Sequence, residues 1–359
     1  MAETQLTARV TRFGDARWSD IEREALAARI PLPLPSREAW WKSHGGDARL
    51  VSVHDATGRV RGALALELAP TRALPGHLLM RALHGGAVLV GTVGDVLLRG
   101  VAALAQEESR VLRVNIELVL RTAAEHERVA VGMRAAGFTP LSSIRHYRDT
   151  LIIDLAGTED QLLASFSTTT RRDLRGWAER PVEMRPLEDA RYGERLNQLA
   201  QETFGRTGGD FAPRPWAERI ALCRELPHAS RLVGLFRAGR DDPDALLAYA
   251  WGCAHGDHAH YDDAGSTRVD DIKVSMMYPL MWDLIRWAKQ QGCSWFDMGG
   301  AVPAEAKDDP RRGISDFKRR FSKEMVAVGA EWELEQHPAR AALARTLRKV
   351  ASRFRGSGS

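Results

Sequence analysis

The same order of elements occurs twice along this 359-residue sequence, and this repetition limits the folds open to the chain. In the first half, apolar runs at 50–53 and 63–68 flank a turn at 55–58, which is the pattern of a β-hairpin. A helical pattern at 95–107 and an apolar strand pattern at 111–118 follow. The first half therefore predicts a hairpin, then a helix, then a strand.

The second half repeats this plan with different residues. Apolar runs at 232–235 and 245–250 predict a hairpin. A helical pattern at 279–290 and a strand pattern at 294–298 follow it. Self-similarity on this scale predicts two copies of one unit rather than a solenoid. We therefore expect an α+β (mixed α/β) protein with two related domains.

The length also favours two domains, because a single hydrophobic core rarely extends over 359 residues. We expect the first domain at 1–155. The second is expected at 156–330 and begins with two predicted helices. A strand and a basic helix are expected at 331–355, and this segment can return to the first domain.

The composition is typical of a soluble protein from a reducing compartment. Hydrophobic residues make up 44% of the sequence and charged residues 27%. Cys223, Cys253 and Cys293 are odd in number and far apart, which fits neither a disulfide framework nor a metal site. The N-terminus lacks the pattern of a signal peptide, and the most apolar stretch, 87–98, is interrupted by two glycines and an aspartate. We expect a cytoplasmic monomer without a metal.

Basic residues are concentrated in three segments although the net charge is only +4. Residues 311–323 carry six Arg or Lys against one Asp, and residues 171–180 carry four arginines. Residues 340–355 carry six basic side chains and no acidic one. This distribution favours a polyanionic partner, which can be a nucleic acid, a phosphorylated ligand or an anionic membrane.

The stretch from 293 to 325 has the most distinctive pattern in the chain. A short strand containing Asp297 leads into Gly299 and Gly300, and glycines at a strand end let a ligand approach the backbone. A polar loop follows, and then Lys318 lies between Phe317 and Phe321. Apolar anchors on both sides hold the stem of such a lysine while its ammonium group faces an anion.

A second basic motif lies on the helix that begins near Ser167. Leu174, Trp177 and Ala178 share one face of this helix, with Arg171 and Arg175 beside that face and Arg172 farther round. Arginines next to an apolar stripe near a helix start can bind an anion at the edge of a cleft. Solvated arginines without a ligand are the alternative.

Together these motifs resemble the Fem-type peptidyltransferases, the FemABX branch of the GNAT-like acyltransferases. The resemblance extends over most of the chain and is strongest after Ser275. Its ending is an Asp-containing strand, a glycine, a variable loop and Phe-Lys-x-x-Phe. Here these parts are Phe296-Asp297-Met-Gly-Gly300, Gly313-Ile314 and Phe317-Lys318-Arg-Arg-Phe321.

The resemblance implies two tandem GNAT-like domains, with an acceptor cleft in the second. It implies transfer of an aminoacyl group from a charged tRNA to an amine on a peptidoglycan precursor or on a small peptide or natural-product intermediate. It implies no metal, no other cofactor and no covalent enzyme intermediate. Fem proteins often have Gly-Gly after this motif where this chain has Ser322-Lys323, and the long coiled-coil arm of some members has no counterpart here. These departures leave the acceptor open.

We assign roles to residues on this basis. Lys318 is the candidate for phosphate contact or oxyanion stabilisation, and Asp297 either accepts the amine proton or orients a backbone turn. The candidate substrate-binding residues are Arg171, Arg172, Arg175, Phe317, Phe321, Gly299, Gly300, Tyr261, Trp41 and Lys42. Trp41 follows Trp40, and paired tryptophans on a predicted helix also occur in cores, which is the alternative for Trp41. The candidate tRNA-binding residues are Arg311, Arg312, Arg319, Arg320 and Lys323.

Two other functional classes remain open. An acyl-CoA-dependent N-acyltransferase would carry an Arg or Gln followed by a glycine-rich anion-binding turn. Arg59, Arg134 and Arg231 each precede a glycine by three residues, but the final small residue is missing. A non-catalytic GNAT-like binding module is the second alternative.

Two further segments have simpler interpretations. His255, His258 and His260 lie at a predicted turn between two strands, where Gly256-Asp257 is ordinary turn chemistry rather than evidence of a metal. The segment at 340–355 is expected to pack as a helix with a basic outer face. Contact with RNA or with an anionic membrane surface is the alternative for it.

Overall fold

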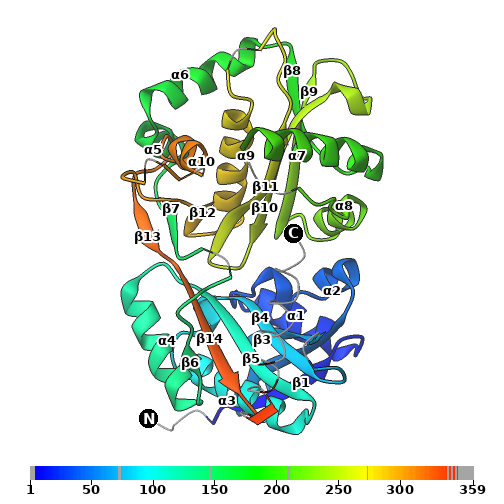
Figure 1. Ribbon diagram of the computed structural model, residues 1–359, viewed down its shortest axis with the longest axis vertical. Helices are drawn as coiled ribbons and strands as arrows, with labels where there is room; N and C mark the ends of the chain where they lie inside the picture. The colour runs from blue at the N-terminus through cyan, green and yellow to red at the C-terminus, as the bar shows by residue number, and fades with distance from the viewer. Residues whose placement is uncertain are drawn as a thin grey trace. The chain divides into compact units, whose positions relative to one another are not determined.

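The structure is a computed structural model that describes residues 5–71, 74–145, 147–207, 211–272, 274–306, 308–309, 311–337, 339–340, 343 and 346. The chain forms two compact units (Figure 1). Unit 1 comprises Met1–Arg145 and Val328–Ser359, and unit 2 comprises His146–Ala327. Each unit contains a seven-stranded mixed sheet with helices packed on it.

Unit 1 has the strand order β1-β2-β3-β4-β5-β14-β6. The strands are β1 (Thr7–Arg12), β2 (Asp47–His54), β3 (Val60–Pro70), β4 (Leu78–Gly85), β5 (Val111–Val119), β6 (Thr139–Pro140) and β14 (Gly329–Glu335). The helices are α1 (Arg17–Ala27), α2 (Glu38–His44), α3 (Thr92–Glu107) and α4 (Ala123–Ala135). β4 and β5 are parallel, and α3 is the crossover between them.

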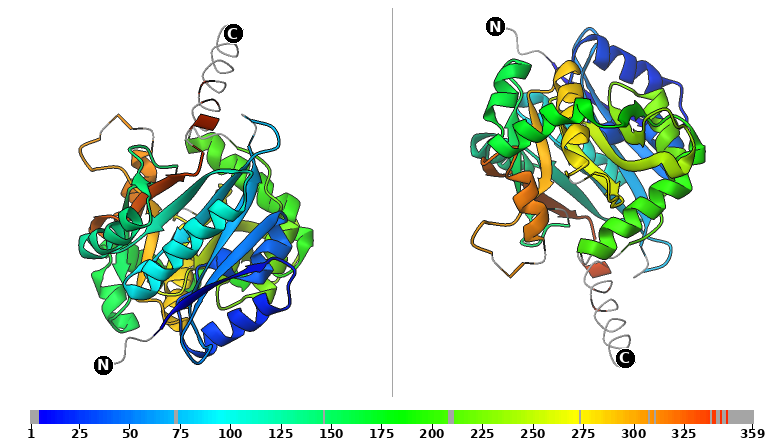
Figure 2. Two further views of the ribbon diagram at one scale, coloured as in Figure 1. Left: turned by 90° about the horizontal axis from the view of Figure 1, so that it is seen from below. Right: turned by 90° about the horizontal axis from the view of Figure 1, so that it is seen from above.

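The sequence explains why α3 covers this sheet. Its buried side chains recur every three or four residues, as in Leu97, Val101 and Leu104, so they form one apolar stripe. This stripe packs on β1, β2 and β3, and Figure 2 shows the cyan helix lying across these strands. One core cluster of unit 1 therefore lies between α3 and the sheet, and a second contains buried residues of α1 and α2, among them Trp18 and Trp41.

Unit 2 has the strand order β13-β7-β12-β11-β10-β9-β8. The strands are β7 (Asp149–Asp154), β8 (Val182–Pro186), β9 (Ser230–Arg237), β10 (Leu246–Ala254), β11 (His258–Ser266), β12 (Trp295–Gly300) and β13 (Met325–Ala327). The helices are α5 (Glu159–Ser165), α6 (Thr168–Gly176), α7 (Gly193–Thr207), α8 (Trp216–Glu225), α9 (Met277–Gln290) and α10 (Arg312–Lys318). β11 and β12 are parallel, with α9 as their crossover.

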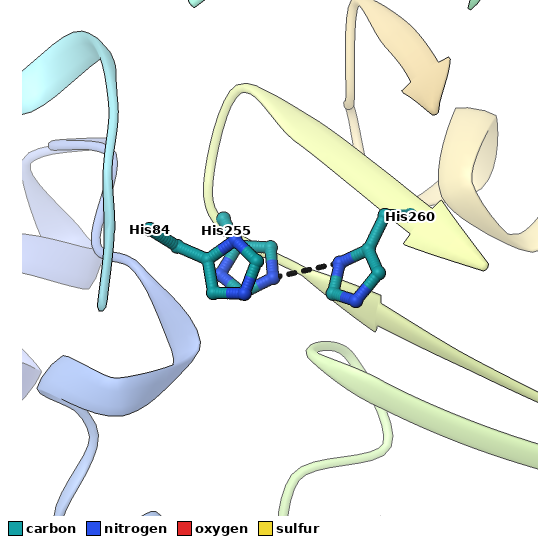
Figure 3. A group of neighbouring side chains, drawn as sticks. All are labelled: His84, His255 and His260. Carbon is teal, nitrogen blue, oxygen red and sulfur yellow. Dashed lines mark hydrogen bonds between the residues drawn. The ribbon is translucent and has the colours of Figure 1, made fainter. Parts of the chain in front are cut away.

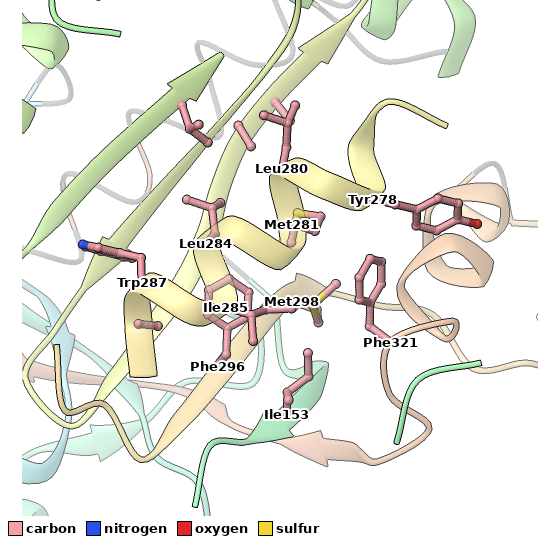
Figure 4. Close-up of a cluster of buried hydrophobic side chains, with 14 of the residues drawn as sticks. Ile153, Tyr278, Leu280, Met281, Leu284, Ile285, Trp287, Phe296, Met298 and Phe321 are labelled. Carbon is pink, nitrogen blue, oxygen red and sulfur yellow. The ribbon is translucent and has the colours of Figure 1, made fainter. Parts of the chain in front are cut away.

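The core of unit 2 forms where α9 packs on β9, β10 and β11. Every residue of β10 is buried, because α9 and α7 both pack on this strand and both of its edges are paired. Leu280, Leu284 and Ile285 of α9 are fully buried in this cluster (Figure 4). The two sheets with their crossover helices confirm the predicted α+β class.

The boundary between the units differs from the one expected at residue 155. The strand predicted at its end is β7, which pairs with β12 and β13 and thus belongs to the second sheet. Sequence alone places this strand after the first unit's helix but gives no information about its partner. The last strand, β14, pairs with β5 in the first sheet. Most of the predicted basic helix at 340–355 lies outside the described residues.

Among the residues that the structure describes, no helix has both the length and the apolar character needed to span a bilayer.

Candidate functional site

The sheet of unit 2 opens between its two parallel strands. β11 and β12 pair at only three positions, and the last of these is His260 opposite Asp297. Beyond that point β11 continues to Ser266 and β12 continues to Gly300 without pairing to each other. Strand ends that separate in this way leave backbone groups available to a ligand. The candidate site is built at this opening.

The carboxylate of Asp297 forms hydrogen bonds to several groups around the opening. It has no exposed surface, and its carboxylate accepts three hydrogen bonds. The Tyr147 hydroxyl donates to it at 2.8 Å, the Gly299 N–H donates at 2.7 Å, and the Thr150 hydroxyl also donates to it. A carboxylate that is engaged so fully holds the end of β12 in place. These contacts favour the orienting role for Asp297 over proton acceptance.

Gly299 and Gly300 follow Asp297 at the end of β12 and allow the chain to turn there. Gly299 has φ +75°, which a residue with a side chain rarely adopts. A Cβ on Gly299 would also lie 3.3 Å from Nζ of Lys318. At Gly300 a Cβ would lie 2.8 Å from Cβ of Tyr147, so something would have to move. Both positions therefore require glycine for close packing around Lys318 and Tyr147.

Lys318 ends α10 and points into the opening. Only 5% of the residue is exposed. Its ammonium group donates to the carbonyl oxygens of Gly299 at 2.9 Å and Gly300 at 2.8 Å. Nζ also lies 5.7 Å from the centre of the Tyr261 ring. An ammonium group has three donors, so this arrangement fixes the lysine and leaves one donor for a ligand.

Burial lowers the pKa of Lys318 to about 8, and the negative charge of Asp297 partly offsets this effect. The side chain is therefore mainly a cation at neutral pH and loses its proton in the mildly alkaline range. The neighbouring Tyr261 is half-buried, and burial raises its pKa. Tyr261 thus stays neutral near the ammonium group. The opening presents one cationic donor in a largely water-free setting, where it can stabilise a developing negative charge.

Phe317 and Phe321 are placed as anchors. Phe321 is 1% exposed and lies in the core, with its ring 5.2 Å from the ring of Phe166. Phe317 stacks on Tyr278 at 5.6 Å. The expected bracketing of Lys318 is observed, but Phe321 does not contact a substrate because the core covers it.

Arg171 and Arg175 come together as expected, and Arg172 does not join them. The first two line one hollow beside Trp282. Arg172 lies farther round α6 and forms an ion pair with Asp173.

The predicted tRNA-binding residues differ in how available they are. Arg311 pairs with Asp309, whereas Arg312 and Arg319 both pair with Asp316. Their charge is therefore partly neutralised, which a count of basic residues does not reveal because it ignores nearby carboxylates.

The remaining two residues of that group, Arg320 and Lys323, have more exposed charge. Arg320 donates to the Tyr278 hydroxyl at 2.7 Å. Lys323 has no ion pair with any described residue. Together with Arg319 they line a hollow of about 810 Å³ beside the start of α6, where the three basic side chains outnumber the two carboxylates, Asp154 and Glu324. This hollow is the part of the predicted basic surface best suited to phosphate groups.

Two residues of unit 1 were predicted to bind substrate. Trp41 is instead part of the core, being 4% exposed, and its indole N–H donates to the carbonyl of Pro35 at 2.7 Å. The core alternative is thus correct for Trp41, because α2 turns this side chain inward. Lys42 is on the exposed face and forms an ion pair with Glu38.

The histidines at the β10–β11 turn hydrogen-bond to one another and to aspartates. Nε2 of His255 lies 3.0 Å from Nδ1 of His260, and a dashed line marks this hydrogen bond in Figure 3. The other ring nitrogen of His260 lies 3.1 Å from Asp262, and His258 pairs with Asp257. The turn expected between two strands at this segment is observed between β10 and β11.

Sequence reasoning missed Tyr147 and Thr150. Both contact Asp297 because β7 runs antiparallel to β12 and places Thr150 opposite Gly300. A hydroxyl residue at the start of a predicted strand carries no signal of this kind. Knowledge of which strand pairs with β12 would have identified both residues.

Replacement of Gly300 by alanine tests this packing. The new methyl group would displace Tyr147, so we expect a loss of about 2 kcal/mol in the free energy of unfolding, by analogy with other overpacked sites. Gly313→Ala is the control, because its Cβ would meet nothing within 4 Å and lies in α10. Gly313→Ala should be neutral or stabilising. Urea denaturation measures both, and equal effects would contradict the packing argument.

With the geometry established, comparisons with known proteins define the class of fold. Residues 164–319 match a family model described as an acetyltransferase (GNAT) domain. Among solved structures, FemX has a TM-score of 0.71 and 15% identity, covering 90% of this chain and 98% of its own. L-PGS from Bacillus licheniformis has a TM-score of 0.52 and 11% identity, covering 96% and 99%. No functionally curated protein matches the sequence.

The chain therefore has the tandem GNAT fold. It shares this fold with FemX, so the predicted resemblance to Fem-type proteins is confirmed at the level of fold.

Proposed function

We propose that this protein is an aminoacyltransferase that takes an aminoacyl group from a charged tRNA and forms an amide bond on an amine acceptor. The observation that carries the proposal is Lys318, a buried cation fixed at the opening between β11 and β12. The likeness of the fold to FemX supports the same reaction class. The hollow beside Arg319, Arg320 and Lys323 supports an RNA donor.

The proposed reaction needs little from the protein beyond alignment and charge stabilisation. The acceptor amine attacks the ester carbonyl, so a C–N bond forms and the C–O bond to the ribose breaks. The proton lost by the amine ends on the departing ribose oxygen. Alignment can supply several kcal/mol of the barrier, and one preorganised donor at the oxyanion can supply about 3 kcal/mol. We assign that donor to Lys318.

The acceptor is an amine on a peptide. A peptidoglycan precursor and a small-peptide or natural-product intermediate are both compatible with this chemistry. We propose that the protein acts as a monomer in the cytoplasm, where charged tRNA is available, and that its basic segments can contact anionic membrane surfaces. No cofactor is required, because the ester of the donor is already activated.

Transfer of a radiolabelled amino acid tests the proposal directly. Total charged tRNA and a pool of peptide amines are incubated with the protein, and the products are identified by mass spectrometry. We expect a new amide product whose formation stops after ribonuclease treatment of the donor. Full transfer after ribonuclease treatment would overturn the proposal.

The same assay distinguishes the proposed reaction from the main alternative, an acyl-CoA-dependent N-acyltransferase. Acetyl-CoA in place of charged tRNA should give no product and no thermal stabilisation if the donor is RNA. Product formation or stabilisation with acetyl-CoA alone would instead support an acyl-CoA-dependent N-acyltransferase.

A further inference from the structure

Unit 2 contains a second hollow, of about 500 Å³, on the helices that precede and follow the hairpin strands. It lies among α5, α6 and α9. The walls combine apolar side chains with charged ones at the edge. The residues that matter are Asp160, Leu163, Leu174, Trp282, Arg171 and Arg175. A hollow of this size can hold a small molecule or one unit of a polymer.

The two arginines in this hollow carry more charge than its one carboxylate, Asp160, can balance. Among the described residues, Arg171 donates only to the Thr168 hydroxyl at 3.3 Å and the Ala164 carbonyl at 3.5 Å, and Arg175 only to the Arg171 carbonyl at 3.3 Å. Within the described part of the chain, neither guanidinium group forms an ion pair. These contacts restrict both side chains while leaving most of their N–H donors for an anion.

Neighbouring arginines on the same helices show that carboxylate partners are available nearby. Arg172 is paired with Asp173, and Arg286 of α9 is paired with Glu159 of α5. Two unpaired guanidinium groups at one apolar hollow are thus a local exception. Charge complementarity calls for an anionic group attached to an apolar or aromatic body.

We infer that this hollow binds a nucleotide, with the base against Leu163, Leu174 and Trp282 and the phosphate at Arg171 and Arg175. Asp160 favours a base over a hydrocarbon chain. A carboxylate covered by hydrocarbon is costly, whereas the amino group of a base can donate to it. Aromatic stacking and arginine contacts to phosphate are the usual means by which single-stranded nucleic acid is held.

The inference rests on the proposed function and names where its donor docks, namely a nucleotide near the aminoacylated end of the RNA. Packed aromatic rings connect the hollow to the helix of Lys318. Trp282 lies 5.6 Å from Phe166, which lies 5.2 Å from Phe321, three residues after Lys318. A nucleotide in the hollow would therefore contact the same packed layer that positions α10.

Binding of a short fluorescein-labelled RNA without an amino acid tests the site by fluorescence anisotropy. We expect Arg171→Gln and Arg175→Gln each to weaken binding about tenfold and to reduce its salt dependence by about one phosphate contact. Trp282→Leu should weaken binding by about tenfold at unchanged salt dependence. Adenosine monophosphate should compete for the wild-type protein, and adenosine or inorganic phosphate alone should compete poorly.

Arg172→Gln is the matched control, because it removes the same charge from the same helix outside the hollow. We expect its affinity to stay within about twofold of wild type, since exposed paired charges contribute little. Equal losses of RNA affinity in all three arginine variants would indicate general electrostatic attraction rather than a specific site. This result would overturn the inference. Thermal denaturation confirms that each variant is folded.

Vesicles of phosphatidylcholine and phosphatidylglycerol test whether the hollow binds an anionic lipid instead of a nucleotide. Binding to these vesicles that depends on Arg171 and Arg175, without binding to RNA, would overturn the nucleotide in favour of a lipid. These binding measurements involve no acyl transfer. The docking site can therefore be refuted without refuting the proposed function. Loss of the site with intact ribonuclease-sensitive transfer refutes only the docking position, whereas intact binding without any transfer refutes only the reaction.

Discussion

Replacement of Lys318 by methionine is expected to lower kcat by about a hundredfold or more, with little change in KM for the acceptor. Methionine keeps most of the apolar stem and removes the donor. The donor acts on charge that develops only in the transition state, so its loss appears in kcat rather than in ground-state binding. Initial rates of aminoacyl transfer at saturating donor measure the effect.

The control for this variant is another lysine whose ammonium group bonds a backbone carbonyl. Lys289 of α9 donates to the Leu155 carbonyl at 2.9 Å in the same unit, away from the opening. Lys289→Met should leave kcat within about twofold of wild type, since a lost hydrogen bond outside the site affects stability rather than rate. If Lys318→Met lowers only the melting temperature and leaves kcat intact, Lys318 is a structural residue.

The pH profile gives a second signature of Lys318. Its pKa of about 8 lies below that of an ordinary lysine, so the donor loses its charge as pH rises through this value. The acceptor amine acts in the opposite direction, because it must lose a proton to attack. We therefore expect kcat/KM to rise and then fall, with an alkaline limb near pH 8 that disappears in Lys318→Met.

Local patterns predicted much of the fold. The helix expected at 279–290 is α9 at Met277–Gln290, and the strand expected at 294–298 is β12 at Trp295–Gly300. Such elements are readable because each buries one face or both, so its apolar residues recur with a fixed period. The repetition of these elements predicted two related domains, and the resemblance to Fem-type proteins implied that both are GNAT-like.

The long-range partners could not be predicted in the same way. Tyr147 and Thr150 meet Asp297 only because β7 joins the second sheet, and Trp41 is buried only because of how α2 packs. The basic residues at 311–323 also looked more available to an anionic ligand than they are, because Asp309 and Asp316 neutralise part of their charge. A single sequence records which side chains are present but not which strands and carboxylates lie beside them.

Replacement of Asp297 by asparagine is expected to move the alkaline limb to lower pH. Asparagine has the same shape, and its amide oxygen can still accept from Thr150 and from the Gly299 N–H. The Tyr147 hydroxyl can rotate to accept from the new amide group. The negative charge that raises the pKa of Lys318 is removed, so this pKa falls below about 8 and the ammonium group is lost earlier as pH rises.

Asp297→Ala separates this electrostatic effect from the structural one. Alanine removes the acceptor of three donors, so we expect a loss on the order of 3 kcal/mol in the free energy of unfolding, together with loss of transfer. Asp297→Asn should retain most of the free energy of unfolding. It should also retain most of the transfer rate at pH values below its shifted alkaline limb. If instead Asp297→Asn abolishes transfer at every pH while remaining as stable as wild type, the carboxylate is a proton acceptor in the reaction rather than a positioning residue for Lys318.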